Sequence, residues 1–215
     1  MRLYINALVM SLIFTIAGGS LMAFEEPDYK VIAKYDNFEI RKYSPYLIAE
    51  TEVDASFEDA TNIAFRILFD YISGKNVKQE KIKMTTPVNQ RNAEPEGEKI
   101  KMTTPVSQKK TLQSDGKYTI NFVIPSKYTL ETVPAPRDPR VNIRKVPQKN
   151  MAVIKYSGRW TQEKYRKHEE KLIKALEKKG LEIIGDPVFA RYNPPFWPSF
   201  MRRNEILLEV KIPVE

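Results

Sequence analysis

The chain of 215 residues contains no cysteine, one histidine and 8 glycines, and these scarcities exclude several classes of protein. Disulfide scaffolds, iron–sulfur clusters and zinc sites built from cysteine all need thiolates. One histidine is too few for a metal centre of three histidines, or of two histidines and a carboxylate. A serine–histidine–acid triad would depend on His168 alone, and no serine lies in a Gly-x-Ser-x-Gly elbow.

The rest of the composition is that of an ordinary globular domain, with 42% apolar and 29% charged residues. The net charge of +8 would suit an anionic partner such as lipid headgroups or a carboxylate-bearing ligand. The basic residues form no block of like charge, so the excess is first interpreted as a solvated surface. No nucleic-acid motif accompanies it, and we expect a monomer without a nucleic-acid partner.

Residues 1–23 differ from everything that follows them. Arg2 is the only charged residue, residues 3–17 are almost continuously apolar, and small residues precede the acidic residues that begin at Glu25. This is the pattern of a secretory signal peptide, which predicts a periplasmic or secreted protein. The alternative is an uncleaved membrane anchor formed by residues 3–23.

Residues 24–213 predict one domain made of two similar halves, about 28–126 and 127–213. In the first half, the patterns predict strands at 30–35, 38–43 and 47–53, a helix from Ser56 to Gly74, and strands at 82–88 or 100–106 and at 118–124. In the second half they predict strands at 141–146 and 151–156, a helix from Thr161 to Gly180, and strands at 187–192 and 205–212. Apart from the first strand, at 30–35, each half therefore has the order strand, strand, helix, strand, strand. This order favours an α+β fold, a distorted antiparallel barrel with two helices packed on it.

A local repeat is the most distinctive motif. Residues 80–90 recur as 98–108 with ten of eleven positions identical. Proline removes a ladder hydrogen bond, so we expect each copy at a sheet edge or bulge. Two interpretations stay open: a hairpin of matched strands around residues 92–97, or an adaptable surface in which Met84 and Met102 contact a flat apolar ligand.

The Lys-Ile-Lys-Met-Thr-Thr-Pro-Val motif, its second copy, and the segments 190–196 and 202–205 resemble the SOUL haem-binding protein family. Residues 128–136 and 156–160 resemble its bacterial branch, and the likeness runs in order over about residues 28–212. The resemblance implies a duplicated module similar to bacterial effector-binding domains. It also implies non-covalent binding of haem or another tetrapyrrole.

The resemblance bears on the axial ligand of such a haem. Family members with a proposed axial histidine carry it in the strand matched here by residues 38–43, where this chain has Lys42. An exposed amine with a pKa near ~10.4 is protonated at neutral pH, and His168 is more simply a packed or surface histidine. We therefore expect Lys42 and His168 to be poor axial ligands. Apolar docking, with arginine or lysine pairing the propionates, is the expected mode of binding.

The candidate ligand-binding residues combine apolar side chains of the first helix, the repeat and an aromatic loop with charged groups. They are Phe65, Arg66, Phe69, Met84, Met102, Phe196, Trp197, Arg202, Arg203 and Glu205. The two arginines of this C-terminal group either pair with propionates or form structural salt bridges with Glu205 or Asp186. The loop at 194–198 either is an exposed lid or membrane-touching tip, or packs and closes the barrel.

The leading hypothesis is an exported haem- or tetrapyrrole-binding protein for transport, buffering or scavenging, and not an enzyme. One alternative is a binding module for another amphiphile, perhaps cationic, that uses Glu205 inside an apolar cleft. Another is a carboxylate-based hydrolase, whose distinguishing feature would be a buried glutamate with a raised pKa.

Overall fold

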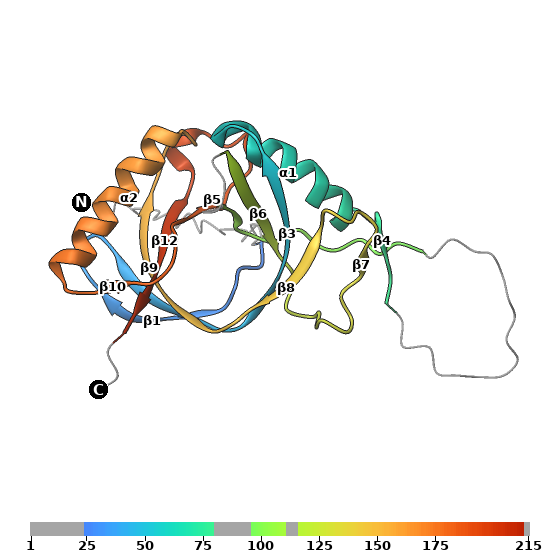
Figure 1. Ribbon diagram of the computed structural model, residues 1–215, viewed down its shortest axis with the longest axis horizontal. Coiled ribbons are helices and arrows are strands. Elements are labelled where there is room, and N and C mark those ends of the chain that lie inside the picture. Colours follow the sequence, from blue (N-terminus) through green and yellow to red (C-terminus); the bar gives the residue numbers. More distant parts are fainter. Residues whose placement is uncertain (1–23, 80–95, 111–115, 213–215) are drawn as a thin grey trace, which may run out of the picture.

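The computed structural model of the chain describes residues 24–79, 96–110 and 116–212. Within these ranges, no helix has both the length and the apolar character needed to cross a bilayer. Two helices lie against the outer face of one curled antiparallel sheet (Figure 1). This arrangement confirms the predicted α+β class.

Both halves have the predicted order of elements, with short additional strands between them. The first half contains β1 (Tyr29–Lys34), β2 (Glu39–Tyr43), β3 (Tyr46–Asp54), α1 (Phe57–Ile72), β4 (Asn76–Val77), β5 (Val106–Lys110) and β6 (Lys117–Val123). The second half contains β7 (Ala135–Pro136), β8 (Asn142–Val146), β9 (Lys149–Tyr156), α2 (Gln162–Lys178), β10 (Glu182–Ile183), β11 (Val188–Arg191), a 3-10 turn (Ser199–Met201) and β12 (Asn204–Lys211). The strands that the sequence did not predict, β4, β7 and β10, are two residues long.

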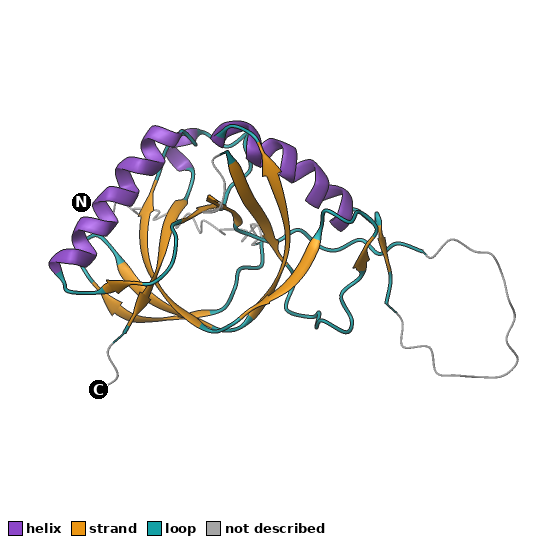
Figure 2. Cartoon of the chain, in the orientation of Figure 1, coloured by secondary structure: helices purple, strands orange, loops and turns teal. Residues whose placement is uncertain are grey.

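The strands form one strongly curled sheet (Figure 2), and this sheet joins the two halves through its middle and through its ends. Its strand order is β1-β2-β9-β12-β11-β5-β6-β3-β8, with β10 paired to β12, while β4 and β7 form a separate pair. The central pair, β5 with β11, takes one strand from each half. Towards the ends the halves exchange strands, because β2 pairs with β9 and β8 pairs with β3. Neither half therefore contains a complete sheet of its own.

Both helices begin and end where local signals place them. The hydroxyls of Ser56 and Thr161 accept hydrogen bonds from backbone N–H groups three residues later, as N-caps do. Gly74 and Gly180 follow the two helix ends with φ of 114° and 66°, a backbone region that favours glycine. The predicted helix boundaries are confirmed.

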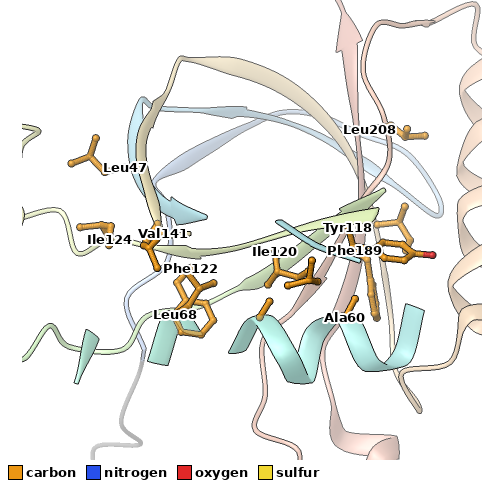
Figure 3. Close-up of a cluster of buried hydrophobic side chains, with 14 of the residues drawn as sticks. Leu47, Ala60, Leu68, Tyr118, Ile120, Phe122, Ile124, Val141, Phe189 and Leu208 are labelled. Atoms are coloured by element: carbon orange, nitrogen blue, oxygen red, sulfur yellow. The ribbon is translucent and has the colours of Figure 1, made fainter. Parts of the chain in front are cut away.

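The sheet buries apolar side chains on both faces. Between sheet and helices, Leu68 of α1 packs in a cluster with Ile120, Phe189 and Leu208 (Figure 3). The inner face carries a smaller cluster, which includes Tyr43, Met151, Val153, Ala190, Tyr192 and Leu207. Because successive side chains of a strand alternate between faces, Leu208 points to the helices while Leu207 points inward.

The prediction for the local repeat is wrong for its second copy, and its first copy, with Met84, lies outside the described residues. Residues 98–105 form an irregular connection, and the strand begins only at Val106. Their backbone donors go to separate partners: Ile100 N–H bonds to the carbonyl of Ile72, and Thr104 N–H to that of Glu25. Within the part of the chain that the structure describes, no single neighbouring strand pairs with this segment, so it forms no hairpin strand there. Pro105 precedes β5 in the centre of the sheet and not at an edge.

Candidate ligand-binding surface

An aromatic pair forms one exposed side of α1. The rings of Phe65 and Phe69, one turn apart, are stacked with centroids 5.6 Å apart and an interplanar angle of 13°. Phe65 packs edge-on against Phe122 of β6, while Phe69 is 45% exposed. Arg66 is exposed on the adjoining side of the helix. The pair thus offers apolar surface to a flat ligand, next to a cation.

The candidate Met102 lies in the connection that passes the C-terminal end of α1. Its side chain is half-buried and packs against the main core. The connection is held to the helix end by the hydrogen bond from Ile100 N–H to Ile72, 2.8 Å long. Met102 therefore serves the core.

Gln108 of β5 connects α1 to the start of the aromatic loop. Its side-chain oxygen accepts hydrogen bonds from Thr61 of α1, at 2.7 Å, and from Arg191 at the end of β11, at 3.0 Å. Its amide nitrogen donates to the carbonyl of Phe57 at 3.0 Å. Thr61 lies one turn before Phe65, so the aromatic side of α1 and the loop that follows Arg191 are joined through one residue.

The loop between β11 and β12 carries Phe196 and Trp197. Phe196 is 82% exposed and Trp197 is half-buried. Arg202 donates hydrogen bonds to the carbonyls of Trp197, at 2.9 Å, and Pro195, at 2.6 Å, and its guanidinium lies 4.4 Å from the ring centroid of Trp160. Arg202 thus fixes the shape of the loop and is only partly available to a ligand. The loop is exposed, which excludes the alternative that it packs and closes the barrel.

Glu205 lies in a buried network on the inner face of the sheet. Arg41 donates to both of its oxygens, at 2.8 and 2.9 Å, and Tyr192 and Arg203 donate one further hydrogen bond each. The carboxylate is fully buried, and four donors occupy its lone pairs. Burial alone would raise the pKa of Glu205, but the hydrogen bonds and charge of Arg41, with Arg203 and Tyr192, bring it below its ordinary value. No oxygen of Glu205 is left to receive a cationic ligand.

Arg203 forms the structural salt bridge with Glu205 that was predicted as the alternative to propionate pairing. Besides Glu205, it pairs with Glu26 at 2.8 Å, and its guanidinium stacks 3.7 Å from the ring centroid of Tyr192. The sequence did not single out Arg41 or Tyr192 as partners in this network. Arg41 lies in an Ile-Arg-Lys sequence that recurs at residues 143–145, but the second copy carries the exposed Arg144, so the repeat does not indicate a buried arginine.

The two candidate axial ligands lie away from the aromatic side of α1. Lys42 is exposed on β2, near one end of the sheet, whereas α1 packs on β3 and β6 towards the other end. His168 stands on α2, where it stacks on Tyr156 with centroids 3.9 Å apart and donates from Nδ1 to the carbonyl of Lys164. The structure does not bring either side chain to Phe65 and Phe69.

Two large cavities also lie away from α1. One of about 600 Å³, on the inner face, mixes charges of both signs around Ile48, Met151 and Val188. The other, of about 520 Å³, lies between residues 25–28, 44–47 and 123–131. A smaller cavity of about 270 Å³ is lined by Glu169, whose pKa burial raises, and by Asp186, which is ion-paired with Lys109 at 2.7 Å.

Two comparisons of the sequence with known proteins agree on one family, and a comparison of structures shows a shared fold. The sequence profile described as SOUL heme-binding protein matches residues 24–209. Heme-binding protein 2 of Mus musculus is 28% identical over 198 residues, which cover 89% of this chain and 88% of the mouse protein. Heme-binding protein 2 of Homo sapiens is 29% identical over 175 residues, covering 80% and 77%. The EcmrR C-terminal domain shares the fold with a TM-score of 0.57 at 7% identity, over 85% of this chain and 98% of that domain.

Proposed function

This chain belongs to the SOUL heme-binding protein family, and from that membership we propose that it binds haem or another tetrapyrrole for transport, buffering or scavenging, without acting on it as an enzyme. Residues 1–23, with their signal-peptide pattern, support export to the periplasm or cell exterior as part of this proposal. The likeness of residues 128–136 to the bacterial branch of the family fits an exported bacterial member.

The observation that carries the proposal is the stacked pair of Phe65 and Phe69, with Phe69 45% exposed beside Arg66. A porphyrin is flat and apolar in its plane and carries its propionates at one edge. The aromatic pair suits the plane, and the exposed guanidinium suits a carboxylate through a charge-assisted hydrogen bond. Phe196 and Trp197 lie on the loop that is joined to α1 through Gln108, and we expect them to contact the ligand at the edge of this surface.

We propose docking without a strong axial ligand. The side chains of Lys42 and His168 lie on β2 and α2, and neither is near the aromatic pair. Affinity then comes from apolar area and propionate pairing, as is usual for largely apolar ligand sites.

The two alternative functions find less support. A cationic amphiphile would need a free carboxylate, whereas four donors already engage Glu205. The carboxylate-based hydrolase would need a buried glutamate with a raised pKa, and Glu169, whose pKa is raised, is only half-buried, while the nearby Asp186 is ion-paired with Lys109. We therefore keep haem or tetrapyrrole binding as the proposal.

A hemin titration of the protein, followed in the Soret region, tests it. We expect a saturable change near one equivalent. Phe69→Ala should weaken binding about tenfold because it removes apolar contact, and Arg66→Gln should weaken it by a smaller factor. Ile63→Ala, which truncates an exposed apolar side chain on another side of α1, is the matched control and should leave the titration unchanged. A flat or unsaturable response of the wild-type protein would overturn the proposal.

A further inference from the structure

Three apolar side chains stand out from the loop between β11 and β12. Phe196 is 82% exposed, Phe200 75% and Met201 55%. Single exposed apolar residues are common on protein surfaces and need no explanation. Three within six residues form a patch of the kind that marks an interaction site.

The loop holds these side chains outward in a fixed shape. Arg202 ties down the carbonyls of Pro195 and Trp197, and two backbone hydrogen bonds, Trp197 N–H to Pro194 and Met201 N–H to Pro198, close tight turns. A surface that is already ordered loses little conformational freedom when it binds. The exposure of the three side chains is thus built into the loop.

Three basic side chains lie near the base of the loop. Arg202 lies against the ring of Trp160, whose neighbour Arg159 is exposed. Lys164 lies close to Gly158, one residue before Arg159. Exposed apolar side chains next to arginine and lysine match a bilayer interface, where the apolar side chains enter the acyl boundary and the cations meet anionic headgroups.

The chain also enters the domain beside this loop. Glu26 pairs with Arg203, at the end of the loop, at 2.8 Å, and Phe24 is 38% exposed. In the sequence, the apolar residues 3–17 and the small residues after them come directly before Phe24. A membrane segment at this position would therefore join the domain on the side of the loop.

We propose that the loop 194–201 is a membrane-contacting tip, which places the domain on an anionic lipid surface through Phe196, Phe200 and Met201. This interaction does not depend on haem. Phe196 belongs both to the predicted haem-binding residues and to the proposed membrane tip. The test therefore uses Phe200 and Met201, which are not among the predicted ligand contacts.

The test is co-sedimentation of residues 24–215 with vesicles of phosphatidylcholine alone or with 30% (about one lipid in three) phosphatidylglycerol. This part of the chain contains every described helix and strand and both apolar clusters, and it lacks the segment that would bind lipid by itself. We expect binding to the anionic vesicles that weakens at high salt. The double variant Phe200→Ser/Met201→Ser should bind them roughly tenfold more weakly. Ile184→Ser, which removes a 53% exposed apolar side chain near β10, should bind like the wild type.

Several results would overturn the proposal. One is wild-type protein that stays in the supernatant with anionic vesicles; another is an equal loss of binding in Ile184→Ser and in the double variant. A concentration-dependent dimer that the double variant abolishes, without vesicle binding, would assign the loop to a second copy of the chain. A hemin titration weakened in the double variant, with vesicle binding unchanged, would assign the loop to the ligand surface.

Discussion

Glu205 and Arg41 are both fully shielded from solvent, and they come from strands of opposite halves. A buried charge is costly unless a partner and further hydrogen bonds compensate it, and here Tyr192, Arg203 and Glu39 complete the network. The intact network adds little net stability, but removing one of its partners leaves an uncompensated buried charge and strongly destabilises the protein. The hydrogen bonds between Arg41 and Glu205 link β2 to β12, the two strands on either side of β9.

Replacing Glu205 by glutamine should therefore destabilise the protein strongly. The substitution leaves the guanidinium of Arg41 buried without its bidentate carboxylate, which costs about 3 kcal/mol. Urea unfolding measures this change. Asp70→Asn, which breaks the exposed pair with Lys75, is the control and should cost less than about 1 kcal/mol. Equal effects of the two substitutions would contradict the role given to the network.

The same carboxylate gives stability a defined dependence on pH. Its pKa in the folded protein lies below the ordinary 4.5, so its stabilisation is fully present above that pH and is lost as the pH falls through the folded-state value. The difference in unfolding free energy between wild type and Glu205→Gln should be constant near neutrality and shrink below about pH 4. Urea titrations at a series of pH values measure it. A difference that grows on acidification would contradict the assignment.

At the scale of elements, α1 is tied to the centre of the sheet through Gln108. Arg191 donates a hydrogen bond to the side-chain oxygen of Gln108 and is buried. Among the described residues no carboxylate lies at hydrogen-bond distance from Arg191, and its Nε has no partner. Burial accordingly lowers the pKa of Arg191, to about 10. The hydrogen bond to the Gln108 amide oxygen thus offsets part of the cost of burying the charge of Arg191.

Gln108→Leu should cost about 2 kcal/mol or more, because it leaves Arg191 and Thr61 with unsatisfied buried donors. Thermal or urea unfolding gives the loss of stability. Gln148→Leu, at an exposed position between β8 and β9, serves as control and should change stability by less than about 0.5 kcal/mol. If Gln108→Leu unfolds like the wild type, the link between helix and sheet contributes nothing.

Elements with local signals could be predicted, and pairings between distant residues could not. Ser56, Thr161, Gly74 and Gly180 mark helix ends by their own chemistry, and the structure confirms them. The second repeat copy shows the opposite case: its alternating pattern predicts a strand, yet its donors bond to separate partners far along the chain.

The same limit applies to the candidate site. Phe65 and Phe69 could be found from helical spacing alone, because the width of the apolar surface of α1 exceeds one ordinary stripe. The partners of Glu205 could not, since 164 positions separate Glu205 from Arg41. A sequence pattern states which side chains can bond, and only the sheet order brings these two together.

At the scale of the whole molecule, the two halves are interlocked. Because β2 pairs with β9 and β8 with β3, each half supplies a strand that extends the other half's sheet. The family relationship and the shared fold of the EcmrR C-terminal domain both span most of the chain, consistent with one folding unit.

Residues 24–126 and residues 127–215 should therefore each fail to fold when expressed alone, whereas residues 24–215 should unfold in one cooperative step. Circular dichroism during urea unfolding distinguishes the two cases. A cooperative transition in either half alone would contradict the interlocking.

In the proposed binding mode, the protein contacts a tetrapyrrole through the plane and edge of the ring and not through the iron. Parallel titrations of residues 24–215 with hemin and with metal-free protoporphyrin IX test it most directly. We expect both compounds to saturate the protein near one equivalent, with dissociation constants within about tenfold of each other. We also expect Phe69→Ala to weaken both, while Lys42→Ala and His168→Ala weaken neither. Binding of hemin alone, with loss on removing Lys42 or His168, or saturation by neither compound, would contradict this binding mode.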